Sequence, residues 1–282
     1  MGVNSTLYIG ASGLRSFAEA MSMTSDNVAN AGTTGYKASH ARFGDMVSSY
    51  LSTQSVNNDR EGSGSALLGV STNFGQGPML GTDTWSDLAI NGQGFFNVQQ
   101  LSSGAPVGNV YYTRDGSFRM DQNGYLVNSQ GYAVLGYQGD TPPATGDPGG
   151  DPIQIDNPTA PAYKNYNITS DGRIWGTPID PTVGVDPILL GAIRVSSFPN
   201  QEGLVRQGAN LYLQGSTSGA AINDQANAAG NGSLVDNNIE SSNVDLATEM
   251  VDMIIYQADY NANSKSVTTG NTMVDTVINM VR

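Results

Sequence analysis

The chain has 282 residues, of which 25 are acidic and 12 basic, and its formal net charge is -13. A charge of this sign repels phosphates and anionic lipid headgroups, so nucleic acid and membrane surfaces are not expected partners. Cysteine is absent and histidine occurs once, as His40, which excludes disulfides, thiolate metal sites and mechanisms that need two imidazoles.

The surface is expected to be polar rather than charged, because 13% of residues are charged, against roughly 25% in ordinary soluble domains. Uncharged polar groups lose less hydration free energy than charged groups when a neighbour covers them. No segment approaches the roughly 20 apolar residues of a membrane span, so membrane insertion is not expected. The first ten residues lack the charged and apolar regions of a cleaved signal peptide. The composition favours a protein that is surrounded by other protein chains.

A seven-residue apolar repeat runs through the first 30 residues and comprises Leu7, Leu14, Met21 and Val28. Residues at this spacing lie on one face of a helix, so the repeat predicts a helix over about residues 7–30. Ser5 or Thr6 is a suitable N-cap, and Gly32 follows a plausible helix end.

A longer repeat of the same spacing closes the chain, at Leu246, Met253, Tyr260, Val267, Val274 and Val281. It predicts a helix over about residues 244–281, with Ser242 and Asp245 as a capping box. A second row beside it contains Met250, Ile254 and Ile278, and Gln257, Ser264 and Asn271 occupy this row midway. Two rows sustained over this length favour a coiled-coil seam, with the amides fixing the register of the pairing. The alternative is a single helix that lies on a globular core.

The middle of the chain has the pattern of antiparallel strands. Turn dipeptides separate short alternating runs at Asn91-Gly92, Asp115-Gly116, Asn123-Gly124 and Asp171-Gly172. Such dipeptides adopt the positive φ angles that two-residue hairpin turns need, so residues 86–239 are predicted to be β-rich. Residues 36–85 are rich in Ser and Gly and are predicted to form an extended, irregular connector.

The terminal helices are expected to pair with each other, because each has an apolar stripe that it does not bury alone. The fold class that follows is α+β. Residues 1–35 and 240–282 form a discontinuous helical coiled-coil domain, residues 36–85 form the connector, and residues 86–239 form an inserted, mainly antiparallel β domain.

Four segments resemble the flagellar rod and hook proteins of bacteria, in the same order along the chain. They are residues 27–31 with 34–37, then 88–96, 112–137 and 241–267. The resemblance implies a tubular filament in which the terminal helices form the inner layer and the β domain faces outward. It also implies export through the flagellum's own type III apparatus without a cleaved signal peptide. Residues 243–246 are more similar to hook proteins, whereas residues 263–265 are more similar to rod proteins.

The residues of the family motifs that we single out are Asn27, Asn30, Gly35, Tyr36, Asn91, Gly92, Gly94 and Phe95. Asparagine caps helices and tolerates left-handed backbone, so a structural role suffices for the asparagines near residue 30. A recognition role in export or assembly is the alternative. An aromatic side chain at residue 36 could anchor the connector to a neighbour.

Chemistry is not predicted for the polar motifs. The glycines near residue 93 are not followed by a helix pattern, which excludes a phosphate-binding loop. Residues 121–124 resemble the start of a calcium loop but lack its final glutamate. Asp115 and Asp121 could form a glycosidase pair, yet both lie in turns where local hydrogen bonds explain them. His40 lies in a polar stretch with no Ser/His/Asp constellation near it in the sequence, so a solvated or locally bonded imidazole is expected. We therefore expect no catalytic, cofactor-binding or metal-binding residues.

The sequence predicts a structural, non-enzymatic subunit of the flagellar hook that polymerises with itself and transmits torque. The expected partners are other copies, further axial proteins (rod, hook cap and hook-filament junction) and the type III export apparatus, and the location is the extracellular hook. One alternative is a distal-rod subunit in the periplasm. Another, from a different class, is a secreted carbohydrate-acting β protein.

Overall fold

The computed structural model describes residues 3–47, 62–102, 104–138, 150–156, 163–179, 186–228 and 230–280. The chain divides into two compact units. The helical unit contains Met1–Ala31, Ala38–Asn73 and Val244–Arg282, and the β unit contains Gly32–Lys37 and Phe74–Asn243. Val281, the last residue of the predicted helix seam, lies outside the described residues.

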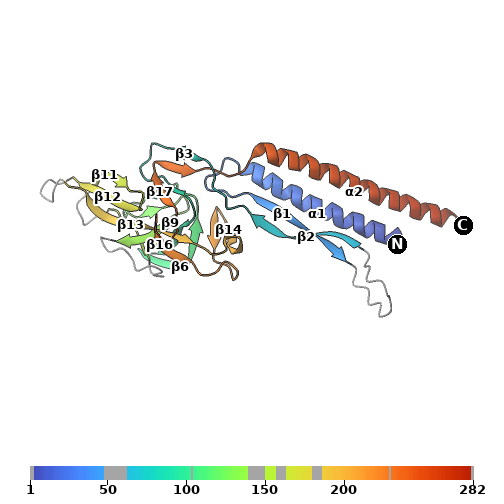
Figure 1. Ribbon diagram of the computed structural model, residues 1–282, viewed down its shortest axis with the longest axis horizontal. Coiled ribbons are helices and arrows are strands. Elements are labelled where there is room, and N and C mark those ends of the chain that lie inside the picture. The colour runs from blue at the N-terminus through green and yellow to red at the C-terminus, as the bar shows by residue number, and fades with distance from the viewer. Residues whose placement is uncertain are drawn as a thin grey trace. The chain divides into compact units, whose positions relative to one another are not determined.

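Two long helices, α1 (Val3–Ala29) and α2 (Leu246–Met280), form most of the helical unit. Figure 1 shows them side by side, with the N- and C-termini at the same end of the pair. Leu7 lies opposite Gly270, and Phe17 lies near Tyr256, so the helices are antiparallel. The two predicted terminal helices are confirmed, as is the α+β class.

A β-hairpin completes the helical unit and corrects the prediction of an irregular connector over residues 36–85. Its strands are β1 (Ser39–Val47) and β2 (Gly62–Thr72), which pair antiparallel with two irregularities in register. The hairpin packs on α1, where the ring of Phe43 lies 5.5 Å from the ring of Phe17.

Small residues explain both the packing of the hairpin and the failure of the sequence pattern to reveal it. Ser16 on α1 donates a hydrogen bond of 3.1 Å to the carbonyl oxygen of Ser65 on β2. A Cβ atom at Gly64 would collide with the side chain of Ser12. Ser and Gly therefore allow close approach of strand to helix here, although they are the residues that indicate loops in a sequence.

The β unit is mainly antiparallel, as predicted. Its elements are β3 (Met79–Gly81), β4 (Leu88–Asn91), β5 (Phe95–Ser102), β6 (Ala105–Thr113), β7 (Arg119–Met120), β8 (Leu126–Val127), β9 (Tyr132–Gln138), β10 (Asp151–Pro152), β11 (Tyr163–Ile168), β12 (Arg173–Pro178), β13 (Ile188–Ser197), the 3-10 turn η1 (Gln201–Gly203), β14 (Val205–Gly208), β15 (Leu211–Leu213), β16 (Ile222–Gln225), β17 (Ser233–Asp236) and β18 (Asn238–Glu240).

One large sheet has the order β11-β12-β13-β9-β5-β6-β15-β14, and β7, β8, β10 and β16 join it from the side. Two short pairs, β17 with β4 and β18 with β3, bring the last strands of the unit beside its first strands. This closure places residue 240, which lies just before α2, next to residue 79. The unit therefore begins and ends at the same place in space.

Two apolar clusters form the core of the β unit. The larger contains Leu88, Ile90, Phe96, Val98, Phe118, Leu126, Val134, Ile153, Ile155, Ile168, Ile174, Ile193, Val195, Leu211, Ala226 and Leu234. The smaller is aromatic and contains Phe95, Tyr112, Phe198, Leu204 and Tyr212. Strand β12 alternates between buried and half-buried positions, the pattern of a strand with one face on a core.

The predicted turn glycines divide into two kinds. Gly92, Gly124 and Gly172 have positive φ, as the dipeptide pattern predicts. Gly116 does not, and the prediction for this dipeptide is wrong. A Cβ atom at Gly116 would collide with the carbonyl oxygen of Leu88, so close backbone approach is the reason for glycine there.

Candidate functional site in the paired helices and a buried ionic node

The terminal helices approach closely because glycines lie at their contact. A Cβ atom at Gly10 would lie 2.6 Å from Val267 Cγ2. A Cβ atom at Gly13 would lie 2.8 Å from the amide group of Asn263. The separation of packed helices depends on the side chains at their contact, so these glycines set a short interhelical distance.

The predicted seam residues divide between contact and exposure. On α1, the half-buried residues include all of the predicted ones: Leu7, Leu14, Met21 and Val28. On α2, Met253, Val267 and Val274 are half-buried. Leu246 and Tyr260 are 44% and 39% exposed.

The second row of α2 differs from the prediction. Met250, Ile254 and Ile278 were expected to line the seam, but they are 54%, 66% and 58% exposed. The row that lies against α1 is displaced by one residue and consists of Glu249, Tyr256, Asn263 and Gly270. A displacement of one residue turns the contact face by about 100° around the helix axis.

This rotation leaves an apolar face of α2 uncovered by the described parts of the chain. The face comprises Leu246, Met250, Val251, Ile254 and Ile255 in its first half and Met273, Val277, Ile278 and Met280 in its second half. Ile254 is 66% exposed, which is unusual for isoleucine in a folded chain. Exposed apolar side chains that gather on one element in this way mark interaction surfaces.

Asn27 joins three elements of the helical unit. Its side-chain amide is fully buried and donates hydrogen bonds to the carbonyl oxygen of Ser39 (2.8 Å) and to Glu249 Oε1 (3.0 Å). Its Oδ1 accepts a hydrogen bond of 3.0 Å from the backbone N–H of Ser39. Asn27 therefore ties α1 to β1 and α2. Asn30, in contrast, donates locally to the carbonyl oxygen of Asp26.

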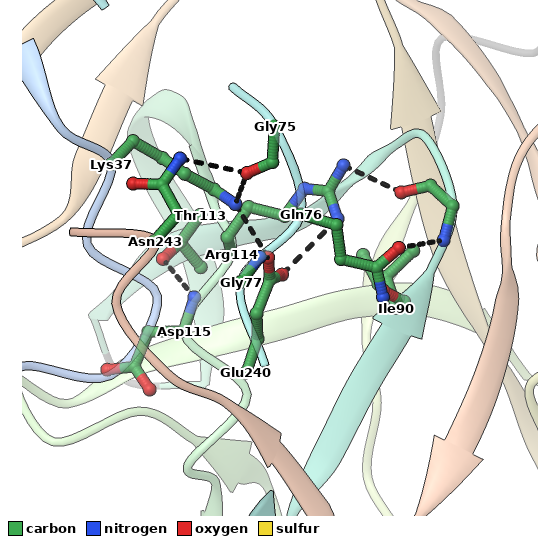
Figure 2. Close-up of polar contacts among 11 residues, drawn as sticks. Lys37, Gly75, Gln76, Gly77, Ile90, Thr113, Arg114, Asp115, Glu240 and Asn243 are labelled. Carbon is green, nitrogen blue, oxygen red and sulfur yellow. Dashed lines mark hydrogen bonds and ion pairs between the residues drawn. The ribbon is translucent and has the colours of Figure 1, made fainter. Parts of the chain in front are cut away.

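The β unit contains a buried ionic node, shown in Figure 2, that consists of Lys37, Arg114 and Glu240. Lys37 Nζ lies 2.6 Å from Glu240 Oε1, and an Arg114 Nη lies 3.3 Å from Glu240 Oε2. The backbone N–H of Gly77 donates to Glu240 Oε1 at 2.8 Å. Lys37 also donates to the carbonyl oxygen of Gly75 at 2.8 Å. Segments far apart in sequence therefore meet at one carboxylate.

Burial shapes the electrostatics of the node. The side chains of Lys37 and Glu240 are completely buried, and that of Arg114 is nearly so. Loss of hydration lowers the pKa of Lys37, and the Glu240 carboxylate opposes this shift. Burial likewise lowers the pKa of Arg114, again opposed by Glu240. Sequence reasoning did not find this node, because residues 37 and 240 are separated by most of the chain.

Several motif residues of the β unit surround the node. Gly35 has positive φ, and a Cβ atom there would lie 2.5 Å from the backbone nitrogen of Asp115. Tyr36 is buried under the guanidinium of Arg206. The carbonyl oxygen of Gly92 accepts a hydrogen bond of 2.9 Å from Arg114.

The other residues of the motif that contains Asn91 lie near Arg114 or pair with a neighbouring strand. Arg114 also lies over the ring of Phe95, 5.3 Å from its centroid. A Cβ atom at Gly94 would collide with Val195. Asn91 is exposed, and its backbone belongs to the pairing of β4 with β17. The motif therefore forms the surface on which Arg114 packs.

The other polar candidates have local roles. Asp115 Oδ1 accepts hydrogen bonds from Ser117 and from the Thr34 hydroxyl, as expected for a turn residue. Asp121 and His40 are exposed. No group of three or more His, Cys, Asp or Glu side chains in the described chain is placed to hold a metal ion. Over their described residues, neither α1 nor α2 is long and apolar enough to cross a bilayer.

Comparison with known families gives three matches along the chain. Residues 7–37 match the flagella basal body rod protein family, and residues 89–176 match the D1 domain of the flagellar hook proteins FlgE/F/G. Residues 235–280 match the C-terminal family of the flagellar basal body rod FlgEFG proteins. The first match covers α1 from Leu7 onward together with Lys37, and the last contains Glu240 and the whole of α2.

Proteins that align with nearly the whole chain are also flagellar rod and hook proteins. The flagellar basal-body rod protein FlgG of Buchnera aphidicola subsp. Acyrthosiphon pisum is 36% identical over an alignment of 278 residues, which covers 95% of this chain and 96% of that protein. FlgG of Bacillus subtilis is 32% identical over an alignment of 286 residues, which covers 98% of this chain and 99% of the relative. The flagellar hook protein FlgE of Brucella suis is 29% identical over an alignment of 399 residues, 97% of this chain and 98% of the relative.

Proposed function

Because the chain belongs to the flagellar basal-body rod and hook protein family, we propose that it is a subunit of the distal rod of the bacterial flagellum. The sequence alone favoured the hook, but alignment length supports the rod alternative. FlgG relatives align over 278 and 286 residues, close to the 282 of this chain. The FlgE alignment extends over 399 residues, so that relative carries a long additional segment.

The observation that carries the proposal is the exposed apolar face of α2. Burial of one large apolar side chain contributes about 1.5–3 kcal/mol, and this face presents several of them to water. Coverage by a second copy removes that surface from water. A contact between two different surfaces of identical chains generates a ring where its rotation closes and a helical filament where it does not, and the filament is the form that a flagellar axial protein requires.

In the assembled tube, we assign the paired helices to the inner wall and the β unit to the outer wall. The pairing of α1 with α2 would act as a coiled-coil seam with close approach at Gly10, Gly13 and Gly270. The closely packed seam within each subunit suits a stiff tube, while the outer face of α2 joins one subunit to the next. This function requires no catalytic residue, and the relatives are named as rod and hook proteins.

Electron microscopy of a strain that lacks the protein tests its place in the flagellum. A distal-rod subunit predicts basal bodies that end in a short rod and carry no hook. Basal bodies with a complete rod but no hook would instead assign the chain to the hook. Basal bodies that keep both structures would refute an axial role altogether.

A surface substitution tests the assembly face. Ile254→Lys places a charge on the outer face of α2, where a neighbouring copy would bury it, so we expect loss of swimming and truncated rods. Met120→Lys is the matched control, since Met120 is an exposed apolar residue of β7 in the β unit. If both variants swim as the unaltered strain does, the face is not an assembly surface.

A further inference from the structure

A short segment between α1 and β1, which we call the strap, belongs to the β unit although its neighbours in sequence belong to the helical unit. The strap is Gly32–Lys37. The bonds that hold its backbone include one from the N–H of Gly35 to the carbonyl oxygen of Glu240 (2.8 Å) and one from Asn210 Nδ2 to the carbonyl oxygen of Thr34 (2.8 Å). Lys37 adds the ionic bond to Glu240.

The segment that leads into α2 meets the strap at the same place. The backbone N–H of Asn243 donates to the carbonyl oxygen of Tyr36 at 3.4 Å. Asn243 Nδ2 donates to the carbonyl oxygen of Gly75 at 3.0 Å, and that oxygen also accepts from Lys37 (Figure 2). The ends that carry α1 and α2 are thus bonded to each other inside the β unit.

The charges of the node show that Lys37 is not needed to neutralise Glu240. Arg114 already neutralises the carboxylate and is fixed by Gly92 and the ring of Phe95. Lys37 brings a second buried cation to one carboxylate, and the hydration that it loses costs free energy. A buried cluster with a net positive charge is less stable than a neutral one. The stability of the β unit therefore does not explain the presence of Lys37.

We infer that Lys37 and Glu240 are positioning residues, which hold the end of α1 beside the start of α2 so that the two helices pair readily. The inference rests on the proposed function only in that the helix pair is the assembling element. The node lies wholly in the β unit and acts on the helices through the connecting chain.

The connecting lengths give the expected size of the effect. With the strap released and the β1–β2 hairpin not docked on α1, about 44 residues lead from Ala29 to the folded β unit at Phe74, whereas about a dozen connect Ala29 to Leu246 through the Lys37–Glu240 bond. A docked hairpin shortens the longer path, because the N–H of Asn73 donates to the carbonyl oxygen of Ala38, so these lengths give an upper limit. Loop-closure entropy varies as three-halves of the logarithm of length, so complete release of the strap lowers the effective concentration of one helix at the other by at most roughly five- to tenfold.

The test measures helix pairing in dilute full-length monomer. The chain has no cysteine, so Gly13→Cys with Asn263→Cys introduces one unique pair at a close contact of α1 and α2. The equilibrium of disulfide formation with glutathione reports the effective concentration of the two thiols. Fluorescence of Trp85 and Trp175, both in the β unit, reports whether that unit is folded.

Two variants release the strap in this background. Lys37→Met leaves the balanced Arg114–Glu240 pair in place and is expected to lower the effective concentration at least about twofold and at most about tenfold, with unchanged tryptophan emission. The decrease stays below the limit for complete release, because the backbone bonds of Gly35 and Tyr36 to the rest of the β unit remain. Asn210→Gly removes a different strap bond, and glycine suits the positive φ of this residue, so a smaller decrease is expected. Arg15→Gln is the control, because it removes a cation from an exposed ion pair on α1.

Three results would overturn the inference. One is a decrease of less than twofold in Lys37→Met. Another is an equal decrease in Arg15→Gln, which would reveal a general effect of charge. The third is unfolded tryptophan emission in Lys37→Met, which would make the lysine a requirement of the β fold. Because the monomer is measured, none of these results depends on whether the assembled chain forms rod or hook.

Discussion

Asn27 provides the sharpest test of how the helical unit is held together, and the change is Asn27→Ala. The substitution removes a buried amide that bonds to both backbone groups of Ser39 and to Glu249. Each buried partner left without a hydrogen bond costs about 1–3 kcal/mol, and relaxation recovers part of this sum. We expect the free energy of unfolding of the helical unit to fall by about 3–5 kcal/mol.

The two units can be followed separately in one urea titration. Circular dichroism at 222 nm reports α1 and α2, whereas tryptophan fluorescence reports Trp85 and Trp175 in the β unit. In Asn27→Ala, the dichroism transition should move to lower urea and the fluorescence transition should stay close to its original midpoint. The concentration of protein is kept low to prevent assembly from stabilising the helices.

Asn30→Ala is the matched control for this prediction. Asn30 lies near the same end of α1 and shares the motif, but its side-chain bonds to Asp26 are local and exposed. Its loss should cost less than about 1 kcal/mol. Equal shifts of the dichroism transition in the two variants would refute the argument, because burial would then make no difference. A shift of the fluorescence transition as large as that of dichroism would also contradict it.

Two further predictions concern packing and pH. Gly10→Leu should destabilise the helical unit by about 1–3 kcal/mol, because a Cβ atom at this position already collides with Val267. Gly32→Ala is the control. A Cβ atom at Gly32 has open space around it, so this variant should have little effect on the dichroism transition. Burial raises the pKa of Tyr212 to about 12 from 10.0, so its contribution to stability is complete below pH 10 and is lost as pH rises through 12. The loss amounts to about 2–3 kcal/mol in unfolding titrations, and Tyr212→Phe should abolish this part of the alkaline slope.

The helices could be predicted from the sequence because helical periodicity is a local property. Repeats of seven residues, and the carboxylate of Asp245 that accepts from the N–H of Ala247 at the start of α2, depend on neighbours within a few positions. The same holds for the turn glycines with positive φ, such as Gly92 and Gly124. The hairpin formed by β1 and β2 was not predicted, because its serines and glycines are explained only by their close contacts with α1.

The contact face of α2 could not be chosen from hydrophobicity. Apolar residues occupy more than one face, and the most apolar of them, including Ile254, are exposed. The face that meets α1 carries Glu249, Asn263 and Gly270, which match Asn27, Gly13 and Leu7 on the partner helix. Complementary size and hydrogen bonding determined the pairing, and neither can be read from one helix alone.

The sequence by itself therefore determined the type and approximate extent of the terminal helices, the antiparallel β character of the middle and the resemblance to the rod and hook proteins. The tertiary structure decided which helix face remains exposed and which charges are buried together. Lys37 and Glu240 illustrate the physical reason. Secondary structure follows from interactions between near neighbours, whereas burial and ion pairing follow from contacts between residues about two hundred positions apart.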